Sequence, residues 1–286
     1  MIEGKVDALV DWVGRGQSGM LSVVVPAHNE QGNLAGTVST LVETLNAAAI
    51  DHEIVVVNDH STDQTEAEAR ALEQHFATVR CINNRLPNGF GFAVRYGLSE
   101  MRGEAVAVVM ADGSDAPEDV VRYWRKLQEG YDCVFGSRFI KGSAVTDYPI
   151  HKLILNRIAN TVVQLLFFHG LNDTTNAFKC YRRDVIAGVQ PLLSNHFNLT
   201  IEIPLKAVIR GYSFAIIPIA WKNRKLGISK LKIREMGSRY IFIMLYCLLE
   251  KSLSRGDYRR EPDLLDDKIA PAAAGKSYPL PMNRQK

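Results

Sequence analysis

The sequence predicts an α/β fold in which a mostly parallel sheet is covered by helices on both faces. Short apolar runs alternate with amphipathic helical patterns over the first half of the chain, and polar motifs begin where the runs end. Strands that alternate with helices form parallel sheets, and strands buried on both faces read as continuous apolar runs. With 286 residues, of which 47% are hydrophobic, the chain is long enough for one large core.

The predicted strands are runs of apolar, often β-branched residues that stop at a turn or a polar cluster. The first reads LSVVV and is expected to end at Pro26, because proline cannot donate a ladder hydrogen bond. The second and fourth end at an acid, and the third ends at an asparagine. Strands are therefore expected at 21–25, 53–59, 79–83, 104–112 and 132–138.

Helical patterns follow the first four strands. After the first strand, Leu34, Val38, Leu41, Val42 and Leu45 recur at spacings of three and four residues, which is typical of an amphipathic helix. Segment 61–76 opens with Ser and Thr, the residue types that favour a helix N-terminus. Two more helices are expected, one after the glycine-rich turn at 89–91 and one over 116–130.

Four polar motifs begin where a predicted strand ends. They are Pro26–Glu30, Asn58–Asp63, Asn88–Gly91 and Asp112–Asp115. In an open α/β sheet the ligand lies beyond the carboxyl ends of the strands. We therefore expect these four motifs to meet at one binding site.

Composition excludes several classes of protein. The formal net charge of +3 is too small for a generally basic nucleic-acid binder. The four cysteines form no CxxC pair, which favours a reduced compartment over a disulfide framework or a zinc site. The N-terminus has no signal-peptide pattern. The longest apolar run, 240–249, is far shorter than the roughly 20 residues that span a bilayer.

Two segments in the second half of the chain are candidates for contact with a membrane surface. Segment 150–168 is helical in pattern, with a polar stripe of Lys152, Asn156, Asn160 and Gln164, and is either a helix packed on the domain or a membrane-interface helix. Segment 222–239 has seven basic residues against the single acid Glu235, and an apolar helix follows. A basic segment followed directly by an apolar helix suits an anionic membrane surface.

Seven sequence segments occur in an order that is typical of one known protein family. In order they read VVVPAHNEQGNL, VVVNDHSTDQT, NGFGFAVRYGL, MADGSDAPED, VFGSRF, NDTTNAFKCYRRDV and NRKLGISKL. Over about residues 21–232 the chain resembles the family 2 glycosyltransferases of GT-A fold, and among these the dolichol-phosphate (polyprenol-phosphate) mannosyltransferases. The resemblance implies an inverting transfer of a hexose, usually mannose from GDP-mannose, to a polyprenyl phosphate.

The resemblance also implies roles for individual residues. The nucleotide-sugar is expected to contact Pro26, Asn29, Glu30, Asp59, Gly89, Asp112 and Ser114. Asp112 and Ser114 are expected to hold Mg²⁺ or Mn²⁺, and Asp112, Asp115 and Arg138 to take part in catalysis. The acceptor phosphate is expected to meet Arg138, Arg157, Arg224, Ser229 and Lys230.

The implied organisation has four parts. They are an N-terminal extension (1–20), a GT-A domain (21–225), a basic loop with an amphipathic, membrane-interface helix (226–260) and a disordered tail (261–286). The expected partners are a nucleotide-sugar, a polyprenyl phosphate and a membrane surface, with no nucleic acid. The expected location is cytoplasmic, at the inner face of the membrane.

The chemistry fits this assignment independently. A leaving nucleoside diphosphate needs a divalent cation, and Mg²⁺ and Mn²⁺ prefer carboxylate and water oxygens. An acceptor phosphate is already largely ionised near pH 7, so it needs positioning and positive charge rather than a general base. A sugar hydroxyl as acceptor would need a base, for which Asp115 is the nearest candidate.

Several residues also have a purely structural interpretation. Asp115, with Glu118 three residues later, reads as a helix N-cap. Arg157 reads as a residue of a solvated helix face, and Glu202 as a half-buried residue near the sheet or near the sugar. The GFGFAV segment partly matches a dinucleotide-binding fingerprint, although it lacks the third glycine.

The chain departs from the family pattern at four positions. Asn58 stands in place of an acid, His60 in place of a glycine, Phe90 in place of the lysine of a GKG loop, and Met110 in place of the first acid of DxD. These changes leave two alternatives open. One is transfer of glucose or an N-acetylhexosamine from a UDP-sugar, to polyprenyl phosphate or to a glycan hydroxyl. The other is a catalytically silent, membrane-docked nucleotide-binding module.

Overall fold

The computed structural model describes residues 17–223 and 233–260. Its strands are β1 (Gln17–Ala27), β2 (His52–Asn58), β3 (Val79–Asn83), β4 (Gly103–Val108), β5 (Cys133–Ser137), β6 (Ala144–Thr146), β7 (Lys179–Arg182), β8 (Phe214–Pro218) and β9 (Ala220–Lys222). Its helices are α2 (Leu34–Ala47), α3 (Thr65–His75), α4 (Phe90–Glu100), α5 (Pro117–Gln128), α6 (Ile150–Phe167), α7 (Arg183–Gly188), α8 (Leu199–Ile209) and α9 (Ile233–Leu253). The predicted tail at 261–286 lies outside the described residues, as do Arg224, Ser229 and Lys230.

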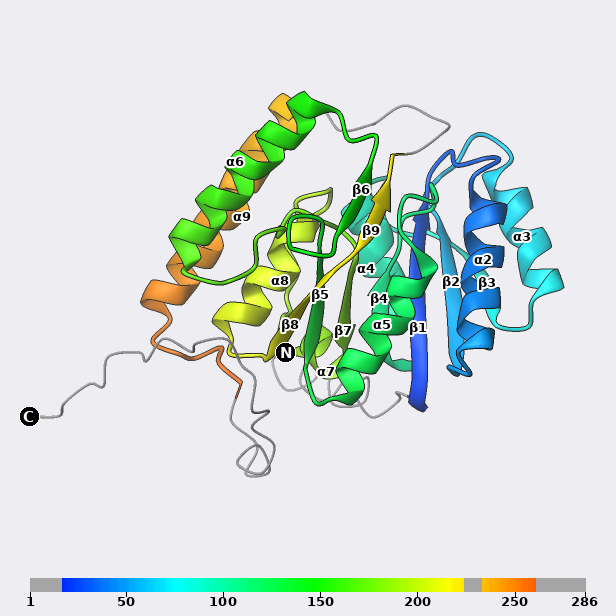
Figure 1. The fold of residues 1–286 in the computed structure, drawn as a ribbon, viewed down its shortest axis with the longest axis horizontal. Coiled ribbons are helices and arrows are strands. Elements are labelled where there is room, and N and C mark those ends of the chain that lie inside the picture. Colours follow the sequence, from blue (N-terminus) through cyan, green and yellow to red (C-terminus); the bar gives the residue numbers. More distant parts are fainter. Residues whose placement is uncertain (1–16, 224–232, 261–286) are drawn as a thin grey trace, which may run out of the picture.

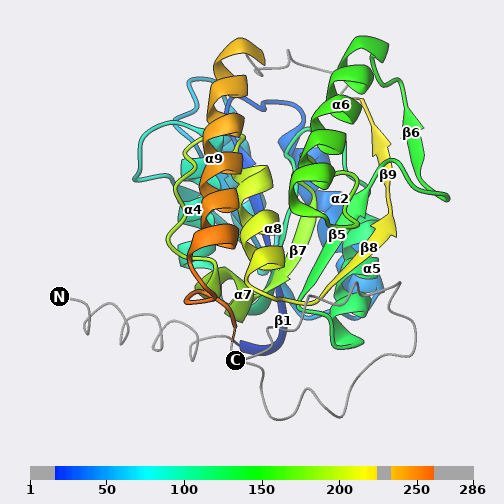
Figure 2. The ribbon, with the colours of Figure 1, turned by 90° about the vertical axis from the view of Figure 1, so that its left-hand side faces the viewer.

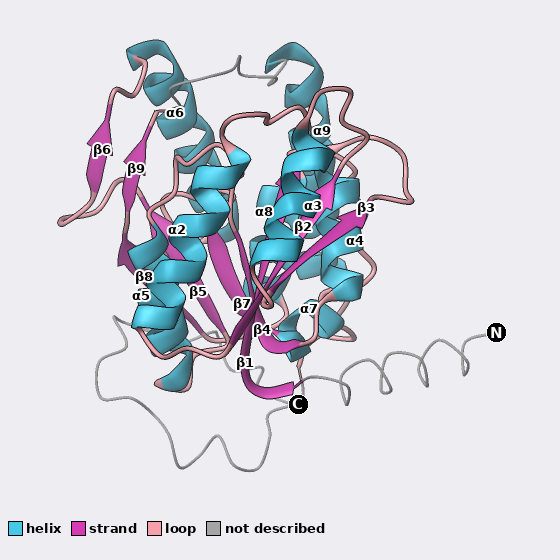
Figure 3. Cartoon of the chain, turned by 90° about the vertical axis from the view of Figure 1, so that its right-hand side faces the viewer, coloured by secondary structure: helices cyan, strands magenta, loops and turns pink. Residues whose placement is uncertain are grey.

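A seven-stranded, mostly parallel sheet forms the centre of the fold (Figure 1). The strand order is β3-β2-β1-β4-β7-β5-β8, and only β7 runs antiparallel to its neighbours β4 and β5. Helices α2, α3 and α5 pack on one face, while α4, α7 and α8 pack on the other (Figure 3). The predicted α/β fold with helices on both faces is therefore confirmed.

Two strands end two or more residues away from the predicted position. β1 continues through Pro26 to Ala27, because β4 pairs only as far as Val24 and leaves no ladder bond for proline to break. The fourth strand ends at Val108 instead of residue 112. There the Met110 N–H turns to the Asp115 carboxylate, and Gly113 adopts a left-handed φ of 69°.

Helices α6 and α9 form a further layer over α8 on one side of the molecule (Figures 1 and 2). Val163 and Phe167 of α6 pack with Ile201 of α8 and with Ile243 and Cys247 of α9. The outward faces of α6 and α9 are apolar. Their exposed large apolar residues are Ile150, Ile154, Leu155, Ile158, Val162, Leu165, Leu166, Ile241, Phe242, Leu245, Leu249 and Leu253. We call this set the apolar face.

Asn160, in the polar stripe of α6, faces inward. It is buried and exchanges hydrogen bonds with Thr175, whereas Ile154, Ile158 and Leu165 are exposed. None of the described helices combines the length and apolar character needed to cross a bilayer. The helix is thus packed on the domain and at the same time exposes an apolar surface.

A close approach between α4 and the loop at 194–197 depends on glycine. A Cβ on Gly91 would lie 2.5 Å from the Asn195 carbonyl carbon and 2.7 Å from the His196 nitrogen, and backbone atoms cannot swing aside. A Cβ on Gly89 would lie 2.7 Å from the Asn195 oxygen. The two glycines therefore allow the loop to approach α4 closely. This packing role gives no support to the interpretation of the GFGFAV segment as a dinucleotide-binding fingerprint.

We predict that Gly91→Ala destabilises the protein by about 1–3 kcal/mol, because the loop must move to admit the methyl group. Gly36→Ala is the matched control, since a Cβ at this exposed helical position meets nothing within 4 Å. Alanine there should be neutral or slightly stabilising. Urea unfolding of both variants makes the comparison, and equal stabilities would contradict the predicted overlap.

Candidate active site

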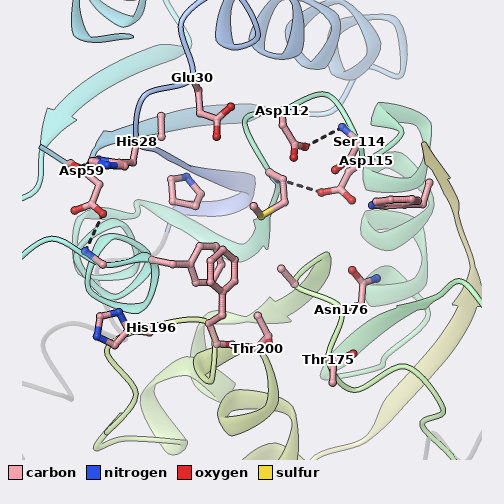
Figure 4. Close-up of a pocket in the computed structure, with 18 of the residues that line it drawn as sticks. His28, Glu30, Asp59, Asp112, Ser114, Asp115, Thr175, Asn176, His196 and Thr200 are labelled. Carbon is pink, nitrogen blue, oxygen red and sulfur yellow. Dashed lines mark hydrogen bonds between the residues drawn. The ribbon is translucent and has the colours of Figure 1, made fainter. Parts of the chain in front are cut away.

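A pocket of about 530 Å³ lies at the carboxyl ends of β1, β2 and β4 (Figure 4). Its opposite wall comes from α6, α8, α9 and the loop at 194–197. The predicted site residues that line it are Pro26, Glu30, Asp59, Gly89, Asp112, Ser114, Asp115 and Arg138. The structure thus brings all four strand-end motifs to one place.

Asp59 is held rigidly at the end of β2. Its Oδ1 accepts a hydrogen bond from Asn84 at 2.7 Å, and its Oδ2 accepts the Gly89 N–H at 2.9 Å. Its backbone N–H donates to the Ala27 carbonyl, which ties the ends of β1 and β2 together. A buried carboxylate fixed in this way presents a defined acceptor edge to a ligand.

Two departures from the family pattern have structural explanations. The Asn58 amide donates to Asn83 at 2.9 Å, and Asn58 does not line the pocket. His60 adopts the left-handed φ of 56° that glycine takes easily, and its Nε2 donates to the Leu86 carbonyl. Both residues shape the turn behind Asp59.

His28 shares the pocket wall with Asp59. Its Nδ1 lies 2.6 Å from the Asp59 carbonyl oxygen and 3.1 Å from the amide nitrogen of Asn88. The sequence contained no spacing rule that would have singled out this histidine.

The turn at 110–115 carries Asp112, which was predicted to hold the metal, and Asp115, which was predicted to take part in catalysis. Asp112 Oδ1 accepts the Ser114 N–H at 3.1 Å, and Asp115 Oδ2 accepts the Met110 N–H at 3.0 Å. Both carboxylates are more than nine-tenths buried. Burial, and then the Asp112 charge, raise the pKa of Asp115 to about 7, although the Met110 N–H opposes the shift.

The N-cap interpretation of Asp115 was wrong. α5 begins at Pro117, and its N-cap is Ala116, without a side-chain hydrogen bond. The Asp115 carboxylate instead turns back to the Met110 N–H and into the pocket. A buried N–H without a partner costs free energy, and Asp115 is the group that reaches this one.

Arg138 forms a buried ion pair with Asp173. The guanidinium donates through Nε and Nη2 to the two carboxylate oxygens, both at 2.8 Å, and the Arg138 N–H donates to the same carboxylate. Burial by itself lowers the pKa of Arg138, but the charge and hydrogen bonds of Asp173 raise it overall. Arg138 therefore stays charged, and Nη1 remains available to a ligand.

Lys179 lies beneath the pocket and is fully buried. Its Nζ donates to the carbonyls of Thr174, Asn176 and Thr200. Burial lowers the pKa of Lys179 to about 7, with Asp173 opposing. This one ammonium joins the 174–176 loop to the first turn of α8.

The wall opposite the acids mixes polar and aromatic groups. Asn156 of α6 lines the pocket beside Thr175, whose hydroxyl donates to the Asn156 Oδ1 at 3.0 Å. Phe90 stacks on Phe197 with a centroid separation of 4.4 Å. Arg239 and Tyr240 extend this wall from α9.

Some residues singled out in the sequence lie elsewhere. Asn29 is exposed, and its Oδ1 accepts the Thr62 N–H instead of lining the pocket. Arg157 is exposed on α6 and rests on the Phe139 ring. Glu202, which was expected to be half-buried, is fully buried and does not line the pocket. Its carboxylate accepts the Leu193 and Ser194 N–H groups and pairs with Lys206, which fixes the loop that carries Phe197.

Many lining residues were not named individually as site residues, although four of them lie within the predicted motifs Pro26–Glu30 and Asn88–Gly91. They are Ala27, His28, Asn88, Phe90, Met110, Tyr148, Asn156, Thr175, Asn176, Ala177, His196, Phe197, Thr200, Trp221, Arg239 and Tyr240. Asp173, the partner of Arg138, was also missed although it opens the quoted DTTN segment. A long-range ion pair leaves no local periodicity to detect.

The oxygen donors of the acidic turn fit a hard divalent cation. Asp112 and Asp115 supply carboxylates and Ser114 a hydroxyl, the ligand types that Mg²⁺ and Mn²⁺ take. Within residues 17–223 and 233–260 no cluster of three or more His, Cys, Asp or Glu could hold a metal alone. Such a site fits a cation that is completed by water and pyrophosphate oxygens.

The fold and this pocket together indicate the class of protein. An acidic turn follows a central strand of a mostly parallel sheet, next to a turn that presents a fixed carboxylate, as in nucleotide-sugar transferases of GT-A fold. The profile of glycosyl transferase family 2 matches residues 22–189, more than half of the chain. The chain belongs to this family and is a glycosyltransferase, so the silent-module alternative is set aside.

Two relatives are similar over three quarters of the chain. The polyprenol monophosphomannose synthase of Mycolicibacterium smegmatis is 32% identical over 222 residues, which cover 74% of this chain and 82% of the relative. The dolichol-phosphate mannosyltransferase of Pyrococcus furiosus is 30% identical over 215 residues, which cover 74% of this chain and 59% of the relative.

Solved structures share the fold. Glucosyl-3-phosphoglycerate synthase of Mycobacterium tuberculosis aligns with a TM-score of 0.59 at 18% identity, over 87% of this chain and 84% of that one. The same enzyme in complex with Mn²⁺, UDP and phosphoglyceric acid aligns with a TM-score of 0.60 at 19% identity, over 87% and 81% of the two chains. At these identities the likeness establishes the GT-A fold alone.

We predict that Asp173→Asn destabilises the protein by about 3–5 kcal/mol, because it leaves the buried Arg138 charge without its counter-charge. Glu129→Gln, in the exposed Lys126–Glu129 pair, is the control and should cost less than about 1 kcal/mol. Chemical denaturation of both variants at neutral pH tests this. Similar losses would mean that the Arg138 charge is compensated elsewhere.

Proposed function

We propose that this glycosyltransferase moves mannose from GDP-mannose to a polyprenyl phosphate with Mg²⁺ or Mn²⁺, at a membrane surface. One observation carries the proposal. The pocket joins an acidic, cation-compatible turn on one side to helices on the other side whose outer surfaces form the apolar face. The names of the two relatives support mannose and a polyprenyl phosphate.

The donor is assigned to the strand-end side. Asp59 and its neighbours Pro26 and Gly89 face the nucleoside, and Glu30 lies between them and the acidic turn (Figure 4). Asp112 and Ser114 would hold the cation, which when bound supplies positive charge to the leaving diphosphate. The metal-bound complexes of the glucosyl-3-phosphoglycerate synthase support this chemistry.

In the reaction an acceptor phosphate oxygen attacks the anomeric carbon as the bond to the diphosphate breaks, and the diphosphate leaves with the bonding electrons. The nucleophile is already an anion, so no proton needs to be removed. Arg138 contributes positive charge and, through Nη1, a donor to the acceptor phosphate. The rings of Phe139, Tyr148 and Trp221 around it exclude water and strengthen its field.

The basic loop is assigned to the same phosphate. β9 ends beside the acidic turn, where the Lys222 N–H donates to the Ser114 carbonyl, and α9 returns to the pocket with Arg239 and Tyr240. Arg224, Ser229 and Lys230 lie between these two points in the sequence. Arg157, on the rim formed by α6, would attract the anionic headgroup.

A direct assay tests the function. The protein is mixed with vesicles that contain polyprenyl phosphate and with GDP-mannose, UDP-glucose or a UDP-N-acetylhexosamine, with Mg²⁺, Mn²⁺ or a chelator. We expect a mannolipid from GDP-mannose that requires the cation. Arg224→Ala and Lys230→Ala should each lose most of this turnover. Transfer to a glycan hydroxyl that survives both substitutions would favour the alternative acceptor instead.

We predict that Leu245→Asp/Leu249→Asp weakens vesicle binding by more than about tenfold, since burying each leucine in lipid is worth about 1.5–3 kcal/mol. The two residues lie on the apolar face, and both are more than half exposed. Co-sedimentation with anionic vesicles measures the effect.

The matched control for this pair is Ala67→Asp/Ala71→Asp. It places the same two charges at the same spacing on exposed positions of α3, on the other side of the molecule from α6 and α9 (Figure 1). The control should bind vesicles as the unchanged protein does. Equal weakening in both pairs would trace binding to net charge and not to the apolar face.

A further inference from the structure

The cation site has a methionine where the family pattern that this sequence resembles has an acid. Met110 takes the place of the first acid of DxD in that pattern, and it lines the pocket. A thioether is a soft ligand, whereas Mg²⁺ and Mn²⁺ prefer oxygen. If Asp112 were the remaining carboxylate ligand, the site would carry half the negative charge of a two-acid site.

The turn supplies a second carboxylate three residues after the first. Gly113 adopts φ 69°, which reverses the chain between Asp112 and Ser114. Asp112, Ser114 and Asp115 consequently lie together on the pocket wall (Figure 4). The side chain of Asp115 is oriented by the Met110 N–H, which donates to Oδ2.

The buried carboxyl group of Asp115 accepts a single hydrogen bond among the described residues. Asp115 is only 6% exposed, and within residues 17–223 and 233–260 it forms no ion pair. Its Oδ2 accepts the Met110 N–H, while Oδ1 accepts no hydrogen bond from the described residues. Arg138, which lines the same pocket, gives two of its N–H groups to Asp173. Buried carboxylates are normally paired or bound to metal.

We propose that Asp115 is the second carboxylate ligand of the catalytic cation, so that Asp112 and Asp115 take the part that acids at positions 110 and 112 have in the family pattern. The inference rests on the proposed function in that it concerns the same cation. It gives Asp115 a role as ligand rather than as general base, in keeping with a phosphate acceptor that needs no base. The ligand is Mg²⁺ or Mn²⁺ together with a nucleoside diphosphate.

Binding of Mn²⁺ in the presence of GDP, followed by electron paramagnetic resonance and calorimetry, tests the proposal without turnover. Asp115→Asn should weaken Mn²⁺ binding by at least about tenfold. The amide keeps an oxygen acceptor for the Met110 N–H, so the metal-free melting temperature should change little. Glu118→Gln removes an exposed charge from the adjacent helix and should leave Mn²⁺ affinity unchanged.

Two further variants separate a ligand from a merely structural residue. Met110→Asp/Asp115→Asn returns an acid to position 110 and should recover most of the lost affinity. Asp115→Cys should shift the preference from Mn²⁺ towards Cd²⁺, because a thiolate is a soft ligand. Asp115→Asn with unchanged Mn²⁺ affinity, or Asp115→Cys without a gain in Cd²⁺ preference, would overturn the proposal.

The outcomes also distinguish this proposal from the proposed function. If the unchanged protein binds no Mn²⁺ with GDP or UDP, the metal-dependent function fails as a whole. If it binds Mn²⁺ and makes the mannolipid while Asp115→Asn binds Mn²⁺ equally well, only the assignment of Asp115 fails.

Discussion

The ion pair between Arg138 and Asp173 is the interaction on which the arrangement of the pocket depends. It joins the end of β5 to the 172–176 loop, and it keeps a cation in a region where a lone charge would be very costly. Lys179 extends the connection below the pocket to the first turn of α8. Strand, loop and helix are thereby fixed relative to one another before any ligand arrives.

The pocket has two sides of different chemistry. The strand ends offer carboxylates and fixed backbone groups that suit a nucleotide and its cation, whereas α6 and α9 offer amides and aromatic rings on one side and an apolar surface on the other. Helix α6 contributes to both sides because its Asn156 lines the pocket and its residues of the apolar face are exposed. The proposed transfer from a water-soluble donor to a lipid-borne acceptor would use such a division.

Much of the fold could be predicted because its signals are local. The runs at β1, β2 and β3 and the helical spacing from Leu34 to Leu45 are visible within a few residues, and the motif order located Asp59, Asp112 and Arg138. β7 could not be predicted, since it has four residues and includes Lys179. The inward orientation of Asn160 could not be predicted either, because its partner Thr175 lies outside the helix. The partners of Asp115 and Glu202 lie within nine residues of them, but they depend on irregular turns that have no periodic pattern.

The close contact of Gly89 and Gly91 with the loop at 194–197 has a consequence for how the protein is made. About a hundred residues separate the two segments, so their contact closes a long loop and is expected to form late in folding. The first strands and helices can assemble as the chain leaves the ribosome, since domains form from the N-terminus onward. The stacked pair of Phe90 and Phe197, however, can form only after α8 has been synthesised and has packed on the sheet. A nascent chain that stops before α8 would have the acidic turn in place, with no opposite wall to hold a substrate against it.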